Sequence, residues 1–483
     1  MSKPHWKHGW LAGLLSAALS ALAGCAAPLP RLDPPIPAQW QHALATNPAH
    51  PTDLHGWWHA FGDPALDRLV DRALANNLDV AAAVERLRAV RALHQRAHAR
   101  YLPALSARTN DVVDPDASAS YFVAGFDANW ELGLFGRAEG TRRVAQGALD
   151  ASVADLQAAR VTLVGETVRE WIALRTAQQQ EELLQQISQQ RQHAWQLLRT
   201  RHGLHLATAS AVDQAQASWA QAEAARAGPQ QAINASAQRL AVLLGQNHPD
   251  PAWLQAGAPP KLGAWQLASA PAELLRTRPE IARAEADVLR SAGELALTHA
   301  DQFPNIGLGA SMVWAADIDN NRRYSTTPNG IASMGPQIDI PLFDWGMRLA
   351  ATHAKAHELQ ATVLAYRQAV LQGVAEVETA LDTLQQQQLR EQHDLLAWQA
   401  LRRADRAVQT RVKLQLDSPL DQIESRIAAA QAAFELADAR AARSLAYVAL
   451  FKAVGGAPLP ATDAPTAQND TSPGPTDNSG TPR

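Results

Sequence analysis

The chain has 483 residues, of which 47% are hydrophobic but only 6% aromatic, and its formal net charge is -4. A charge this small, with no basic block beyond the N-terminus, excludes an extended nucleic-acid-binding surface. The body of the chain has no run of about 18 apolar residues, so no transmembrane helix is expected there, and any membrane crossing must use strands. The abundance of Ala, Gln, Arg and Leu at helical spacing predicts long helices with few bulky core residues.

The N-terminus has the features of a targeting signal. Two lysines, Lys3 and Lys7, precede the apolar stretch WLAGLLSAALSALAG, which is too short and too rich in small residues to span a membrane as a helix. The following Leu22-Ala23-Gly24-Cys25 resembles a bacterial lipobox, and Cys25 is the only cysteine. We therefore expect a signal peptide over 1–24 and a covalent lipid (palmitate or a similar acyl group) on Cys25. The alternative is a plain signal peptide with a chance cysteine.

A stable membrane anchor needs more than one acyl chain, as a lipidated N-terminal cysteine would supply. By resemblance to other lipoproteins, Ala26 rather than Asp after the cysteine favours the outer membrane. With a single cysteine, a disulfide within one chain is excluded.

The segment 25–63 is expected to be an N-terminal anchor, in which Trp57 and Trp58 fix the chain to the helices. Carbohydrate stacking by these tryptophans is the less favoured alternative. His55 and His59, like His94 and His98, have i, i+4 spacing, but no third ligand is near and the glutamate of a metalloprotease motif is missing. We therefore expect these histidines to be polar residues on the surface of helices rather than metal ligands. No phosphate-binding loop, nucleophile elbow or cofactor motif is found, so neither an enzyme nor a cofactor is expected.

The chain contains an internal duplication. Residues 77–105 align with 278–306, and Pro103 and Pro304 are 201 positions apart. Further on, the alignment pairs Leu134-Phe135 with Leu342-Phe343, Thr200-Arg201 with Thr410-Arg411, and Asp213 with Asp421. We predict a first repeat over 64–246, a connector over 247–270 and a second repeat over 271–456. Each repeat would consist of a helix, an exit marked by proline, two strands, a very long helix, a turn and a last helix.

Three segments, 121–135, 305–314 and 335–343, alternate apolar residues with polar or small ones. Segments of about ten residues with this alternation and with aromatic residues suit strands that face lipid on one side and water on the other. A water-soluble sandwich is the alternative. The two repeats supply about four strands, whereas the smallest closed barrels need about eight and an open edge is not tolerated in lipid. One chain therefore cannot close a barrel, and we expect it to oligomerise.

Two runs without proline, from Arg137 to about Arg201 and between Pro341 and Pro419, predict very long helices. At about 1.5 Å per residue, each run extends on the order of 100 Å. Apolar residues repeat in them at coiled-coil spacing, which predicts antiparallel coiled coils or a helical tube. The residues are Val161, Val164, Val168 and Trp171 in the first run and Val370, Val374, Val377, Leu381 and Leu384 in the second. Gly228-Pro229 should kink the last helix of the first repeat.

The stretch NWELGLFGRAEG at 129–140 turns directly from strand into helix, and IDIPLFDWGMRLA at 338–350 does the same. We interpret both as the joint between the membrane strands and the periplasmic helices, with five joint residues: Phe135, Gly136, Phe343, Pro103 and Pro304. The tail 457–483 is rich in Pro, Thr, Ser and Asp, so we expect it to be disordered.

The combination of several motifs resembles the TolC-type outer-membrane efflux lipoproteins, the lipidated outer-membrane factors of tripartite efflux pumps. The motifs are WWHAFGDPALDRLVDRALANNLDV at 57–80, RPEI at 278–281, LFGRAEGTRR at 134–143, IPLFDWGMRLA at 340–350 and RLAVLLGQ at 239–246. The resemblance covers about 35–455. It implies a mainly α fold with a membrane β-barrel. In a homotrimer, four strands per chain would form a twelve-stranded β-barrel, continued by an α-barrel of long antiparallel coiled-coil helices.

In that family, helix-turn-helix residues close the periplasmic tip. The resemblance therefore implies a gate at Leu416, Asp417, Asp421 and Asp213, where three-fold symmetry would turn Asp417 into a ring of three carboxylates held by bases such as Arg411. The alternative is that these aspartates only cap a helix, and both roles can coexist. Pro419 departs from the family pattern at this turn.

The resemblance further implies a passive exit duct in the outer membrane of a Gram-negative bacterium. The duct would extend into the periplasm, release small toxic molecules such as drugs and thus give multidrug resistance. Its partners would be a periplasmic adaptor, an inner-membrane efflux pump and outer-membrane lipid, with no nucleic acid. The alternative function is that of a lipid-anchored periplasmic adaptor, which would share the anchor and the helices but would need no lipid-facing strands.

Overall fold

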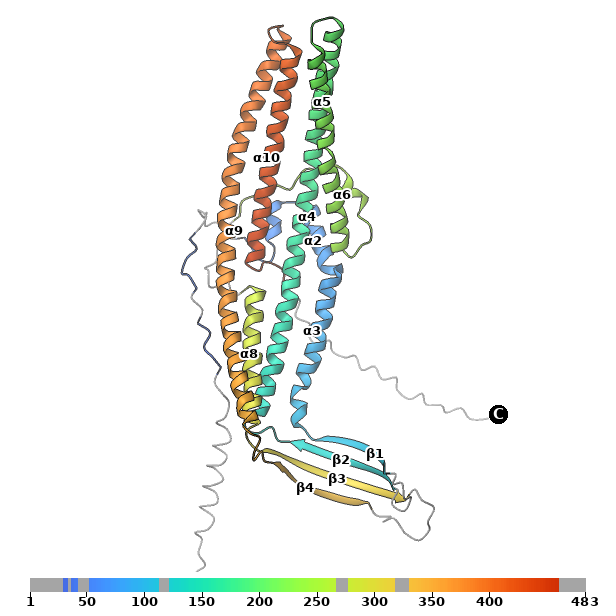
Figure 1. Ribbon diagram of the computed structural model, residues 1–483, viewed down its shortest axis with the longest axis vertical. Helices are drawn as coiled ribbons and strands as arrows, with labels where there is room; N and C mark the ends of the chain where they lie inside the picture. The colour runs from blue at the N-terminus through green and yellow to red at the C-terminus, as the bar shows by residue number, and fades with distance from the viewer. Residues whose placement is uncertain are drawn as a thin grey trace, which may run out of the picture.

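The computed structural model describes residues 29–33, 36–41, 52–112, 121–265, 277–317 and 330–459. The expected signal peptide, Cys25 and residues 460–483 lie outside these ranges. The described chain is elongated, with a sheet at one end and two helical hairpins at the other (Figure 1).

The first repeat contains α2 (Pro64–Asn76), α3 (Leu78–Arg96), β1 (Ala104–Val112), β2 (Tyr121–Glu131), α4 (Arg137–Gly203), α5 (Ala209–Ala225) and α6 (Ala227–Leu243). The second contains α8 (Pro279–Ala300), β3 (Asn305–Asp317), β4 (Ile331–Asp339), α9 (Met347–Lys413) and α10 (Pro419–Ala453). Three short 3-10 helices are η1 (Trp57–Phe61), η2 (Ala97–Tyr101) and η3 (Pro251–Leu254). The predicted order of helix, strands, long helix and returning helix thus occurs twice.

The two long helices are confirmed, because α4 and α9 each have 67 residues. Their predicted apolar seams are buried: Val164 and Val168 in α4, and Val377 and Leu384 in α9, are inaccessible to solvent. Each long helix turns back into an antiparallel partner, α5 for α4 and α10 for α9 (Figure 1).

The returning helices differ between the repeats. In the first repeat the helix is interrupted at Arg226, where α5 ends and α6 begins, and Pro229 lies in the first turn of α6. A proline is tolerated there because its missing N–H would have no partner in a first turn. In the second repeat α10 continues for 35 residues. The sequence predicts a kink at Gly228-Pro229, and the structure has a one-residue break between α5 and α6 at Arg226, just before this pair.

The four strands form one antiparallel sheet in the order β1-β2-β3-β4. The register places Phe126 opposite Met312 and Asp127 opposite Ser311, so apolar and polar side chains alternate between the two faces. Phe126 also packs edge-to-face on Trp314, with ring centroids 6.0 Å apart. Both Phe126 and Met312 remain exposed in the single chain, which is expected of a sheet face that contacts lipid or another protein.

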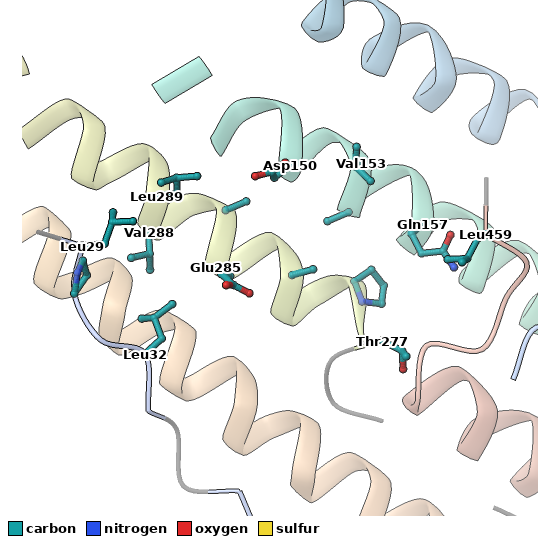
Figure 2. A pocket seen from close by; sticks show the side chains of 15 residues that line it. Leu29, Leu32, Asp150, Val153, Gln157, Thr277, Glu285, Val288, Leu289 and Leu459 are labelled. Carbon is teal, nitrogen blue, oxygen red and sulfur yellow. The ribbon is translucent and has the colours of Figure 1, made fainter. Parts of the chain in front are cut away.

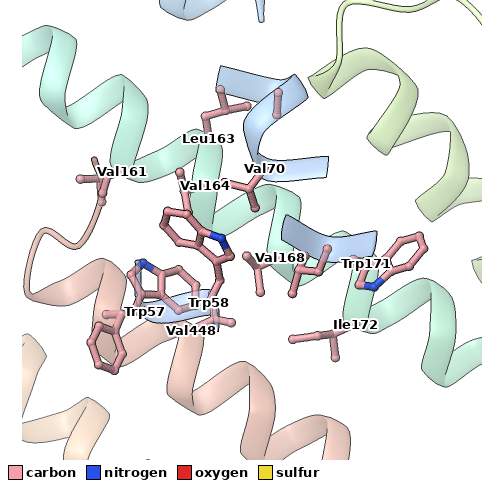
Figure 3. Packing of buried hydrophobic residues seen from close by; sticks show 14 of the residues in the cluster. Trp57, Trp58, Val70, Val161, Leu163, Val164, Val168, Trp171, Ile172 and Val448 are labelled. Carbon is pink, nitrogen blue, oxygen red and sulfur yellow. The ribbon is translucent and has the colours of Figure 1, made fainter. Parts of the chain in front are cut away.

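The main core lies where η1 inserts between α4 and α10 (Figure 3). The Trp57 ring is fully buried and stacks on Phe451 with centroids 5.6 Å apart. Its Nε1 donates to the Gly456 carbonyl, and the Tyr447 hydroxyl donates to the Trp57 carbonyl. The prediction that Trp57 and Trp58 anchor the N-terminal segment is confirmed.

Both ends of the described chain pack along the helices. Leu32 and Ile36 contact the cluster that α8 and α9 form with Val288 and Val363. At the other end, Ala457 is fully buried and its carbonyl accepts a hydrogen bond from the Gln157 side-chain amide. The structure describes 457–459, so the expectation of disorder from 457 onward is wrong for these residues. The Ala457 and Pro458 carbonyls accept hydrogen bonds from Gln157 and Arg160 on α4.

Replacing Trp57 with Ala should lower the free energy of unfolding by about 3–5 kcal/mol, since it empties a fully buried ring site and leaves the Gly456 carbonyl unpaired. Chemical denaturation followed by circular dichroism measures the loss. Trp398→Ala, at a half-exposed position on α9, is the matched control and should cost far less. Equal losses for the two variants would contradict the assigned core.

Candidate functional site

The joint of the first repeat is a sharp turn between β2 and α4. Phe135 has a φ of 57° and Gly136 a φ of 90°, and both lie in the left-handed region. A phenylalanine pays a steric cost there, and its ring is held by stacking on Phe303 with centroids 5.3 Å apart. Gly133 has a φ of 62° and lies so close to Tyr101 that a Cβ would stand 2.7 Å from the ring. The backbone carbonyl of Tyr101 accepts a hydrogen bond from Trp130 Nε1, and the Tyr101 hydroxyl is hydrogen-bonded to the hydroxyl of Thr141 on α4.

The joint of the second repeat has the same backbone geometry. Trp345 has a φ of 57° and Gly346 a φ of 82°. Asp344 accepts from the backbone N–H groups of Gly346 and Arg348 and so caps the start of α9. By backbone conformation Trp345 therefore corresponds to Phe135, and Gly346 to Gly136.

The predicted pairing of Phe135 with Phe343 is wrong by two residues, because the connection from β4 to α9 (340–346) is two residues longer than that from β2 to α4 (132–136). Phe343 still lies in the segment between β4 and α9, and it is 74% exposed, as Trp345 is 88% exposed. Pro103 precedes β1 and Pro304 precedes β3, so both prolines stand at entries to the sheet. Whether these five residues act as the joint of a duct is taken up below.

The first turn of α4 carries an ion-pair cluster directly above the joint. Glu139 accepts hydrogen bonds from Arg142 and Arg143. The hydrogen bond from Arg142 is the main cause that lowers the Glu139 pKa to about 2, and Arg143 contributes. Arg137 reaches across to Asp301 at the end of α8, at 2.7 Å, and so ties the two repeats together beside the sheet.

At the opposite end, the two hairpin turns correspond residue by residue at a constant offset in the sequence. Each long helix is followed by a residue with a φ of 60°, His205 in one hairpin and Gln415 in the other. Thr208 and Ser418 then cap α5 and α10. Asp213 consequently corresponds to Ile423 and not to Asp421, so the predicted pairing of these aspartates is wrong. Asp213 is an exposed residue of α5.

The gate candidates of the second hairpin have different surroundings. Asp421 forms a reciprocal capping box with Ser418, whose hydroxyl and backbone N–H lower the pKa of Asp421. Asp417 does not cap the helix; it accepts a hydrogen bond from Arg411 at 2.7 Å, and its side chain is only 14% exposed. Leu416, beside it, is exposed. The structure thus places the capping role on Asp421 and an ion pair on Asp417.

A link between the two hairpins was not predicted. Arg191 on α4 donates to Glu424 on α10 at 2.8 Å. Next to this pair, Ile187 and Ala194 pack on Ile423 and Ile427. The paired residues are 233 positions apart, and no sequence pattern sets the register of one hairpin against the other.

Three of the four paired histidines have partners of their own. His55 contacts the Ala457 carbonyl, His59 pairs with Asp67 at 2.7 Å, and His94 contacts Gln146. Within the described ranges, no three His, Cys, Asp or Glu side chains gather in a way that could hold a metal ion. No helix of the described chain is both long and apolar enough to cross a membrane.

Comparison with known proteins gives consistent matches over most of the chain. A family model described as outer membrane efflux protein matches residues 69–246 and 270–456. The chain is 31% identical over 472 residues to the pyoverdine export outer membrane protein OpmQ of Pseudomonas aeruginosa, covering 92% of this chain and 96% of that protein. It is 27% identical over 471 residues to the probable efflux pump outer membrane protein TtgC of Pseudomonas putida, covering 92% and 95%. The solved outer-membrane channel OprN has a TM-score of 0.77 at 25% identity, covering 90% of this chain and 99% of that one.

Replacing Asp417 with Ala should raise the conductance of single channels in a planar bilayer, because it removes a carboxylate and frees Arg411 at the tip. Asp71→Ala, which removes an exposed carboxylate from α2, away from the tips, is the control and should leave the conductance unchanged. An Asp417→Ala channel that conducts like the unmodified protein would exclude a gating role for this residue.

The capping box predicts a pH dependence confined to the start of α10. The Asp421 pKa lies below its usual value of 3.8, so the stabilisation is complete above that value and is lost as the pH falls through the lowered pKa. The backbone amides of Ser418 and of residues 421–423 should therefore exchange faster, after correction for intrinsic rates, at about pH 3 than at about pH 6. In Asp421→Asn the same amides should already exchange fast at the higher pH and change little. A pH response that persists in this variant would refute the assignment.

Proposed function

This chain belongs to the outer membrane efflux protein family, and we propose that three copies of it form a passive exit duct through the outer membrane. The family is a transport component rather than an enzyme. The observation that carries the proposal is a four-stranded sheet with two open edges, continued directly by two helices of 67 residues.

The open edges require a partner. Among the described strands, β1 and β4 each pair on one side only, and the other side presents unpaired backbone N–H and C=O groups. In lipid such groups must be satisfied, and four strands are too few to close on themselves. Pairing β4 of one copy with β1 of the next satisfies every edge at once, and three copies give the twelve strands that the family resemblance implies.

Ring closure through the edges also determines which helices meet. Since β4 leads into α9 and β1 follows α3, closure brings α9 beside α3 of the next copy. The chain already contains the equivalent contact. Strand β2 leads into α4, its neighbour β3 follows α8, and α4 and α8 pack closely together. At that contact, a Cβ on Gly147 would stand 2.9 Å from Cβ of Arg290.

The free side of α9 suits such a contact. Leu364, Leu371, Leu389 and Leu396 are all exposed in the single chain. They are separated by seven, eighteen and seven residues, which are close to whole numbers of helical turns, so the four leucines form one stripe. An apolar stripe on a helix that already packs α8 and α10 on its other sides supports burial against another copy.

In this proposal, the sheets form the membrane barrel, the helices form a water-filled tube in the periplasm, and the joints at Phe135-Gly136 and Trp345-Gly346 lie at the membrane surface. Lipid on Cys25 anchors the assembly. The hairpin tips, held by Arg411–Asp417 and Arg191–Glu424, dock to a periplasmic adaptor and through it to an inner-membrane pump that supplies the energy. Small molecules then leave by diffusion. The apolar face of the sheet supports a duct over the alternative of a lipid-anchored adaptor, which needs no such strands.

The proposed contact between copies can be tested with a disulfide. By the offsets between repeats, His357 of α9 corresponds to Gly147, and Ala89 of α3 corresponds to Arg290. Both His357 and Ala89 are exposed in the single chain. The double variant His357→Cys and Ala89→Cys should therefore form covalent dimers and trimers under oxidation, visible on a non-reducing gel. A side chain at position 357 requires the two helices to lie slightly farther apart than they do at Gly147, which brings the two Cβ atoms toward the range of about 3.5–4.5 Å that a disulfide needs.

The matched control is His357→Cys combined with Leu78→Cys, which places the second thiol three turns farther along α3 and should give monomers. Monomers from the first pair, or equal crosslinking of both pairs, would contradict the arrangement.

A further inference from the structure

The two hairpin tips, taken as residues 191–220 and 401–430, gather positive charge at one end of an acidic chain (Figure 1). They contain nine Lys and Arg against five Asp and Glu, which is a net charge of +4 per chain. Because the whole chain has a net charge of -4, all other residues together carry -8. At the cavity between α4 and α8, for example, Asp150 and Glu285 are the only charged side chains among the described residues that line it (Figure 2).

Most bases of the tips have no carboxylate partner. Arg411 pairs with Asp417, and Arg191 pairs with Glu424. The other seven bases form no ion pair with any residue that the structure describes, and six of the seven are exposed. The seven are Arg199, Arg201, Arg402, Arg403, Arg406, Lys413 and Arg426.

The tip carboxylates do not offset this charge. Asp417 and Glu424 are in the two ion pairs, and Asp421 accepts hydrogen bonds from the hydroxyl and the backbone N–H of Ser418. Even with every carboxylate ionised, three copies of the tips would carry a net charge of +12, three times that of one chain. The field at this end of the assembly is therefore positive.

Helix capping explains only some of these bases. Cations are favoured at the C-terminus of a helix, and Arg201, Arg411 and Lys413 lie in the last turns of α4 and α9. The effect falls off within the last turn. Arg403 and Arg406 lie about two to three turns before the end of α9, so the helix dipole does not account for them.

We propose that the tips make the periplasmic entrance of the duct selective for anions, so that its cargo consists of small molecules with a carboxylate or another anionic group. This inference rests on the proposed function, in which the tips surround the entrance. A positive ring raises the local concentration of anions and lowers that of cations, and rings of Arg or Lys select anions in channels. At about 0.1 M salt the Debye length of about 10 Å matches the diameter of a helix, so a base contributes from any side of its helix.

The test measures the ion selectivity of the unmodified full chain in a planar bilayer between two concentrations of KCl. With about 0.1 M salt on the dilute side, chloride should be at least about 3-fold more permeant than potassium, because a positive potential of about half of kT at the entrance suffices for that ratio. With both solutions near 1 M, where the Debye length is about 3 Å, the ratio should fall toward unity. At low salt, benzoate should likewise permeate better than benzylammonium, a cation of similar size.

Paired substitutions separate the tips from the rest of the chain. Arg403 and Arg406 are suitable because both are exposed, whereas Arg402 lies over the Trp398 ring. Arg403→Gln with Arg406→Gln removes half of the net tip charge and should reduce the chloride-to-potassium ratio to about its square root, since the logarithm of the ratio follows the potential. Arg403→Glu with Arg406→Glu removes all of the net charge and should abolish or reverse the preference.

The matched control is Arg68→Gln with Arg72→Gln, which removes the same charge from α2, away from the tips, and should leave the ratio unchanged (Figure 1). Preference for potassium or no preference in the unmodified channel would overturn the inference. A chloride preference that the tip variants leave unchanged would also overturn it and would assign the bases to another role, such as contact with an acidic adaptor. A complete lack of channels from the unmodified protein would contradict the duct itself, whereas channels of either selectivity support the duct.

Discussion

Backbone groups at a sheet edge cannot remain unpaired in lipid, and the architecture of this chain follows from that constraint. The described sheet has four strands and two open edges. Because each strand is joined to a helix by a short connection, whatever pairs the edges also sets which helices pack together. In the proposed assembly, α9 and α3 of adjacent copies pack as α4 and α8 do inside the chain.

The two repeats share the same backbone geometry at the joint, but their side-chain contacts differ. Phe135 and Trp345 adopt the same left-handed conformation, yet Phe135 stacks on Phe303 whereas Trp345 is exposed. At the tips, Ala207 stands where the second repeat has Asp417, so only one hairpin carries the Arg411–Asp417 pair. The Arg411–Asp417 ion pair thus occurs in the second repeat alone. The exposed Trp345 follows the edge strand β4, where a neighbouring copy is expected.

Much of the fold could be predicted from the sequence because the signals are long and repetitive. The absence of proline over two runs predicts α4 and α9, and alternation in 121–135 predicts β2. Strand β1, ALSARTNDV, lacks a clear apolar alternation, so its bounds could not be read in advance. The candidate sites were less accessible. Loop lengths shift the alignment by two residues, which misassigned Phe343 and Asp213, and the Arg191–Glu424 pair and the cavity between α4 and α8 depend on three-dimensional register.

The central claim is that the open sheet closes only between copies, three at a time. Native mass spectrometry of the full chain, extracted from membranes in a mild detergent, counts the copies directly. The account predicts a mass of three chains, each carrying its lipid. A folded single chain, or a stable assembly of two, would contradict it.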